Sequence, residues 1–71
     1  MNLQTAEPGK QYKIKSVETN DEELNAFLFS LGCYSGEPIT LISRRKSGCI
    51  VLVKNGRYSI DAALAAAITV I

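Results

Sequence analysis

Apolar residues recur with a helical period between residues 21 and 31 and with the period of a strand in most of the rest of the chain. In the helical stretch, four large apolar residues are spaced three or four apart and share one face: Leu24, Phe27, Leu28 and Leu31. A helix in a soluble protein normally buries such a face. We therefore predict that all four side chains belong to the core.

The predicted helix carries signals at both ends. Asn20 is a suitable N-cap, and Glu23 stands three residues later, where its side chain can complete a capping box. Gly32 stands where a left-handed residue ends a helix, and the turn-forming residues 35–38 (SGEP) follow it. The sequence thus predicts one short helix that leads through a turn into a strand.

Alternation of apolar and polar residues predicts strands on both sides of this helix. Residues 11–18 alternate with a slip of phase near Ser16, which indicates a half-buried strand with a β-bulge. Short loops separate three further predicted strands, which should form an antiparallel meander: 38–45, 49–54 and 57–60. Asn55-Gly56 is the strongest of the hairpin signals. Because residues 49–54 are almost all apolar, we expect this strand to be central and covered on both faces.

The last residues predict how the sheet closes. Asp61 can cap a brief helical turn over residues 62–66, and residues 67–71 alternate again as a final strand. Pairing of that strand with the first one would remove two exposed edges. The predicted fold is mainly β, a small barrel with the order β-α-β-β-β-short helix-β, formed by one domain over residues 1–71.

Composition narrows the classes of function. Eight basic and seven acidic residues give a net charge of +1, without the basic excess of a dedicated nucleic-acid binder. No signal peptide is visible, and the longest apolar run, residues 62–71, is too short to span a bilayer. We expect a soluble, intracellular protein with no direct membrane insertion.

Groups that carry out catalysis are scarce. The chain has no histidine, so the usual general base at neutral pH is missing. Cys33 follows the end of a helix, a position that should raise the pKa of its thiol. A zinc site would need Cys33, Cys49 and two carboxylates, an uncommon ligand set, and an intracellular location argues against a disulfide. We predict two free thiols, no metal site, no cofactor and no enzymatic activity.

Two groups of residues are candidates for binding a partner. Phe29 lies off the apolar helix face and close in sequence to Tyr34, so the two form either an exposed apolar patch or a site covered by the N-terminal segment. The only basic run, Arg44, Arg45 and Lys46, lies at a predicted hairpin tip, either as a solvated tip or as a nucleic-acid patch. The chain order leaves open whether this tip lies beside the aromatic residues.

Several ordered motifs resemble one known family. The helix and turn, residues 28–39 (LFSLGCYSGEPI), are similar to a signature in which a glycine follows the helix and a second glycine lies in the turn. An early Pro8-Gly9, the meander with Gly48 and Gly56, and the ending over residues 58–70 complete the pattern. On these motifs the chain resembles the ferrous iron transport protein A (FeoA) domain over nearly its whole length.

The resemblance implies an SH3-like barrel with an inserted helix. It also implies a small cytoplasmic protein that accompanies the ferrous iron permease and binds its cytoplasmic GTP-binding domain. The resemblance leaves open whether ferrous iron itself binds, and the sequence indicates no ligands for it. This sequence departs from the family pattern at two places. The helix lacks the arginines that are frequent in the family, and Lys46-Ser47-Gly48-Cys49 replaces a turn that is common in it. The alternatives are a small barrel that binds nucleic acid, a repressor-type ligand-binding module and a barrel that binds proline motifs.

Overall fold

Strands and helices follow one another in the predicted order in the computed structural model, which describes residues 1–71. Each bound lies within one residue of its predicted position: β1 (Lys10–Val17), α1 (Glu22–Leu31), β2 (Pro38–Arg45), β3 (Gly48–Val53), β4 (Gly56–Asp61), α2 (Ala62–Ala67) and β5 (Ile68–Val70). The predicted and observed bounds agree because the spacing of apolar residues changes sharply between the helical period and the strand period.

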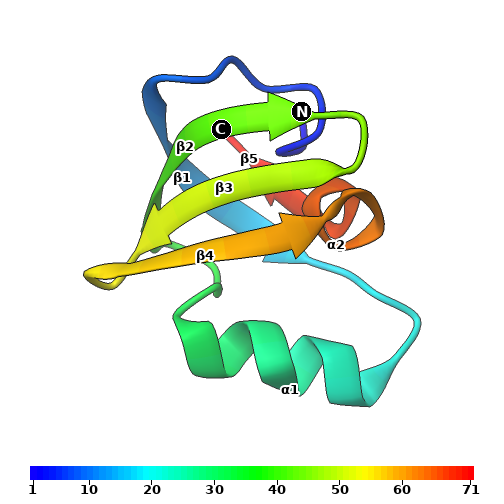
Figure 1. Cartoon of the computed structure of the whole chain (residues 1–71). Coiled ribbons are helices and arrows are strands. Elements are labelled where there is room, and N and C mark those ends of the chain that lie inside the picture. Colours follow the sequence, from blue (N-terminus) through cyan, green and yellow to red (C-terminus); the bar gives the residue numbers. More distant parts are fainter.

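The five strands form one antiparallel sheet in the order β4-β3-β2-β1-β5 (Figure 1). β1 serves two partners, because its first half pairs with β2 and its second half with β5. The register shifts between Ile14 and Ser16, which confirms the predicted bulge. That bend lets the terminal strand pair with the first one, as predicted, and closes the sheet into an SH3-like barrel. Helix α2 bridges the remaining gap between β4 and β5 (Figure 1).

The core lies inside this curved sheet and receives side chains from every strand and both helices. Besides Gly32, the buried residues all carry apolar side chains: Leu3, Ala6, Ile14, Leu28, Cys33, Ile39, Leu41, Cys49, Val51, Val53, Ile60, Ala65, Ile68 and Val70. Leu3 and Ala6 show that the N-terminal segment is part of the core.

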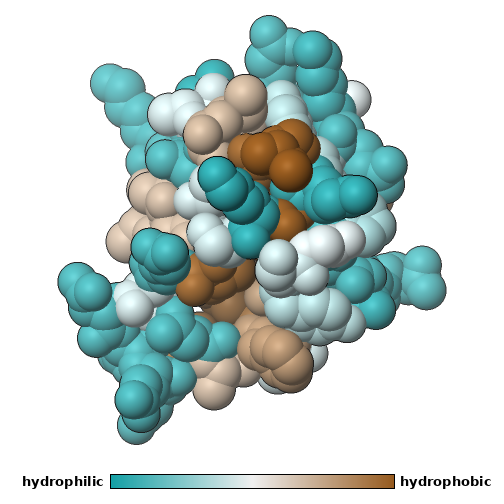
Figure 2. Space-filling model, turned by 180° about the vertical axis from the view of Figure 1, so that it is seen from behind, coloured by the Kyte–Doolittle hydropathy of each residue, from teal (hydrophilic) through white to brown (hydrophobic).

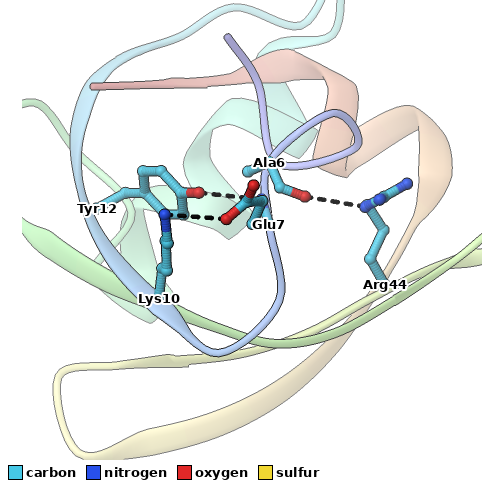
Figure 3. A network of polar contacts seen from close by, with 5 residues as sticks. All are labelled: Ala6, Glu7, Lys10, Tyr12 and Arg44. Carbon is cyan, nitrogen blue, oxygen red and sulfur yellow. Dashed lines mark hydrogen bonds and ion pairs between the residues drawn. The ribbon is translucent and has the colours of Figure 1, made fainter.

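Polar contacts hold this N-terminal segment against the barrel (Figure 3). The Arg44 guanidinium donates from Nε to the carbonyl oxygen of Ala6 at 3.0 Å. The backbone N–H of Glu7 donates to the Tyr12 hydroxyl at 3.0 Å, and the Glu7 carboxylate pairs with Lys10 at 2.9 Å. These contacts bind residues before β1 to the beginning of β1 and to the end of β2.

The hairpin between β3 and β4 forms, but its turn is displaced by one residue from the prediction. Lys54 and Asn55 both have positive φ, +50° and +66°, as the two central residues of a type I′ turn require. Gly56 is not in the turn, because it already pairs with Val53 as the first residue of β4. A side chain at Gly56 would collide with the ring of Tyr58, which explains the glycine there.

The prediction that β3 is covered on both faces is wrong. β3 is central in the sheet, and Cys49, Val51 and Val53 are buried inside the barrel. On the outer face, however, Ile50 is half-buried and Leu52 is 41% exposed. The reason is that α1 lies below the β4 edge and does not cross the outer face of β3 (Figure 1).

Candidate protein-binding surface

Asp21, and not Asn20, is the N-cap of α1. Its carboxylate accepts hydrogen bonds from the backbone N–H of Glu23 at 2.9 Å and of Leu24 at 3.4 Å. The Asn25 side chain reaches back to Thr19, whose N–H it accepts at 3.0 Å. This contact, together with a hydrogen bond from the Thr19 hydroxyl to the Asp21 carbonyl, fixes the chain so that Asp21 occupies the cap. The predicted capping box from Asn20 does not form.

The other end of α1 is as predicted. Gly32 has φ +103°, and its N–H bonds back to the carbonyls of Leu28 and Phe29. The N–H of Cys33 also donates to the Leu28 carbonyl, at 2.9 Å, so two donors close the last turn. A side chain at Gly32 would also collide with that of Lys54, so the helix end and the β3–β4 hairpin tip lie close together.

Only half of the predicted core face of α1 is buried. Leu28 is fully buried and Leu31 packs against the core, but Leu24 is 39% and Phe27 48% exposed. The prediction that all four side chains are core residues is therefore wrong for Leu24 and Phe27. Leu24 borders a cleft that α2 also lines, and α2 presents mainly alanine side chains there, which are too short to fill the space. Phe27 borders a separate open depression beside Ile50 and Leu64.

Phe29 and Tyr34 form an aromatic pair on the surface beside the end of α1. Their ring centroids are 4.9 Å apart and the rings are tilted by 39°. Phe29 is 63% exposed and Tyr34 is half-buried. The N-terminal segment packs elsewhere and does not cover Phe29, which decides between the two alternatives that the sequence left open. The pair borders a shallow depression of about 370 Å³ that Val17 and Cys33 also line.

Lys54 joins this aromatic pair from the hairpin between β3 and β4. Its Nζ lies 5.3 Å from the Tyr34 ring centroid and 3.0 Å from a Glu37 carboxylate oxygen. The pKa of Lys54 is raised, chiefly by its hydrogen bond with Tyr34 and next by its hydrogen bond with Glu37. Sequence reasoning missed Lys54 as a member of this surface, because no local pattern connects it with residues twenty positions earlier. We call Phe29, Tyr34 and Lys54 the aromatic patch.

The predicted basic residues lie away from the aromatic patch. Tyr34 lies four residues before β2 begins at Pro38, whereas Arg44, Arg45 and Lys46 lie at the other end of β2. The strand between them spans roughly 20 Å. Arg44 is engaged with the N-terminal segment, and the Arg45 carbonyl accepts a hydrogen bond from Gln4 at 2.8 Å. The structure therefore brings Phe29 and Tyr34 together and separates them from the basic hairpin tip.

Both cysteines are buried free thiols. Burial raises the pKa of the Cys33 thiol to about 11. The direction is as predicted, but its cause is burial and not the nearby helix end. Burial also raises the pKa of Cys49, whose Sγ lies 3.5 Å from the Leu3 carbonyl oxygen. No three His, Cys, Asp or Glu side chains gather into a group that could hold a metal ion. No helix is both long enough and apolar enough to cross a membrane.

Comparison with known proteins places this geometry in a family. The model of the FeoA domain matches residues 1–71. The chain belongs to the FeoA domain family. A comparison with curated protein sequences finds no match.

Solved structures share the fold at low sequence identity. A crystal structure of an iron uptake regulatory protein, FeoA, superposes with a TM-score of 0.87 at 22% identity, over 99% of this chain and 93% of that one. The zinc complex of Stenotrophomonas maltophilia FeoA gives a TM-score of 0.86 at 19% identity, over 99% of this chain and 88% of that one, and is described as a prokaryotic SH3 domain protein. A manganese-dependent transcriptional repressor gives 0.90 at 16% identity, with all of this chain matching 40% of that chain. At these identities the likeness establishes the SH3-like fold.

Proposed function

We propose that this chain is a cytoplasmic accessory protein of ferrous iron uptake, without chemistry of its own, that binds the cytoplasmic GTP-binding domain of the ferrous iron permease. Membership of the FeoA domain family supports the link to iron uptake. The observation that supports a binding role is the aromatic patch, in which Phe29 is 63% exposed and packs against the ring of Tyr34.

The aromatic patch has the chemistry of an interface anchor. Exposed aromatic side chains bury a large area at small cost in conformational entropy, which is why they dominate many interfaces. Tyr34 is already held, because Phe29 packs on its ring and Lys54 lies over it while bonding to Glu37. A surface that is ordered before binding loses less entropy on association.

The proposed role requires no bound metal. The two thiols are buried in different surroundings, and no histidine is available to complete a ligand set. Calorimetric titration of tag-free protein with zinc or ferrous iron should show no stoichiometric site of sub-micromolar affinity. Such a site, lost in the Cys33→Ser/Cys49→Ser double variant, would contradict this part of the proposal.

The partner role is tested by measuring affinity for the purified cytoplasmic domain of the permease. Phe29→Ala and Tyr34→Ala should each weaken binding by about 1–3 kcal/mol, since each removes an aromatic anchor. Ile71→Ala is the matched control, because Ile71 is 68% exposed, as apolar as Phe29 and outside the depression beside the patch. Circular dichroism should show the same fold in all three variants. Unchanged affinity in the Phe29→Ala/Tyr34→Ala double variant would place the interface elsewhere on the barrel.

The basic hairpin tip should act mainly on the rate of association. Arg45→Ala and Lys46→Ala remove exposed charges, and their effect should fade at high salt. Arg44→Ala has an additional structural consequence, because it removes the hydrogen bond to Ala6. If the parent protein ignores the permease domain and instead shows salt-dependent binding to DNA or RNA, the nucleic-acid alternative replaces this proposal.

A further inference from the structure

A second apolar surface lies between the first half of α1 and α2. The cleft measures about 510 Å³, and its apolar lining consists of Leu24, Ala63, Leu64, Ala66 and Ala67. We call this cleft the α1–α2 groove. Leu64 also borders a second depression on its other side. Phe27 and the half-buried Ile50 line that depression, together with Arg45 of the basic hairpin tip. In Figure 2, apolar side chains interrupt the polar surface in the middle of the rear face and toward its lower end, where α1 lies in Figure 1.

Carboxylates without an ion-pair partner lie at this groove and near it. Two of the seven acidic residues, Glu7 and Glu37, form the two ion pairs of the structure. The other five belong to the two helices or to the segments that lead into them, and none has a cationic partner: Glu18, Asp21, Glu22, Glu23 and Asp61. Glu18 and Asp21 line the groove itself, which no lysine or arginine lines.

We propose that the α1–α2 groove binds a basic amphipathic helix of a partner protein. The apolar side chains of such a helix would cover Leu24 and Leu64, while its lysines or arginines would meet the unpaired carboxylates at the rim. A membrane surface is the wrong partner, because anionic lipids are repelled by this rim. Nucleic acid is excluded from the groove for the same reason. The inference does not depend on the proposed binding of the permease through the aromatic patch.

The probe is an amphipathic leucine–lysine peptide, LKKLLKLLKKLLKL, titrated into the whole protein at low salt. Amide chemical shifts should change in the first half of α1 and in α2, and fluorescence anisotropy of the labelled peptide should give a dissociation constant that rises with salt. The triple variant Glu18→Gln/Glu22→Gln/Glu23→Gln removes carboxylates that take part in no ion pair in the structure, so the fold should be kept. It should weaken peptide binding about tenfold, since three ion pairs of modest strength are lost.

Two controls make the result specific. Glu7→Gln/Glu37→Gln also removes negative charge, but from carboxylates far from the groove, and should change the affinity less than twofold. The charge-reversed peptide LEELLELLEELLEL should not bind. The proposal is overturned if the triple variant binds as the parent does, if the shift changes gather at Phe29 and Tyr34, or if vesicles of anionic lipid bind at the groove and the peptide does not. Loss of permease binding in the Phe29→Ala variant, with peptide binding kept, would show that the two surfaces are separate.

Discussion

The two halves of α1 present the same kind of apolar face to the rest of the molecule, but the barrel covers only one of them. In the second half, Leu28 is fully buried, Leu31 packs on the core, and Gly32 returns the chain to the buried Cys33. In the first half, Leu24 borders an open groove and is 39% exposed. The side chains opposite each half differ: large branched residues of the strands face Leu28, and alanines of α2 face Leu24.

This difference separates anchoring from binding within one ten-residue helix. The covered half attaches α1 to the barrel through the buried Leu28 and through Leu31, which packs on the core. The open half keeps apolar surface and unpaired carboxylates exposed to solvent, at little benefit to the free energy of folding. Apolar surface that stays exposed without stabilising the fold is typical of a binding surface. Three changes in and around α1 test the distinction, in order of decreasing expected effect.

The largest effect is expected from truncating the covered half. Leu28→Ala should lower the free energy of unfolding by ~2–5 kcal/mol, because it leaves a cavity in the core. For a domain of this size that loss can approach the whole stability. Leu24→Ala, the matched change in the open half, should cost less than about 1 kcal/mol, since the side chain is already partly in water. Urea unfolding followed by circular dichroism measures both, and equal losses would show that the two halves are anchored alike.

A smaller effect should come from Cys33, at alkaline pH. The pKa of its thiol is raised from 9.0 to about 11 in the folded state. Below pH 9 the thiol is protonated in both states and stability is unaffected, whereas between pH 9 and 11 only the unfolded state ionises. The free energy of unfolding should therefore fall by about 1.4 kcal/mol per pH unit through that window, roughly 2–3 kcal/mol in total. A Cys33→Ala variant should lack this part of the decline, and parallel curves for parent and variant would mean that Cys33 is accessible to water.

The smallest effect concerns the cap of the open half. Asp21→Ala removes the side chain that accepts from two backbone N–H groups and should cost about 1 kcal/mol in thermal or urea unfolding. Asn20→Ala, one residue earlier, removes a side chain that accepts neither of these cap hydrogen bonds and should change stability by only a few tenths of a kcal/mol. The opposite ranking would restore Asn20 as the cap. Hydrogen exchange should also be faster in the first turn of α1 than in its last turn, because the buried Leu28 protects only the second half.

Local patterns were sufficient for much of the candidate site. The spacing from Leu24 to Leu31 identified the helix, and Gly32 located its end, because both signals act within one or two turns. The position of Phe29 off that stripe marked it as a candidate but left open whether it is exposed or covered. The four residues between it and Tyr34 allow the two rings to meet. Lys54 could not be assigned to the same surface, because only the closed sheet brings the β3–β4 hairpin tip to the end of α1.

The sequence by itself determined the order of the elements, the bulge at Ser16 and the end of α1, because each depends on residues that are neighbours along the chain. Only the tertiary structure decided that Leu24 and Phe27 stay partly exposed, that β3 is open on its outer face, and that the basic tip lies away from Phe29. Periodicity shows which side chains share a face, whereas burial depends on what the fold places opposite that face. Opposite Leu24 the fold places the alanines of α2, and the groove remains open.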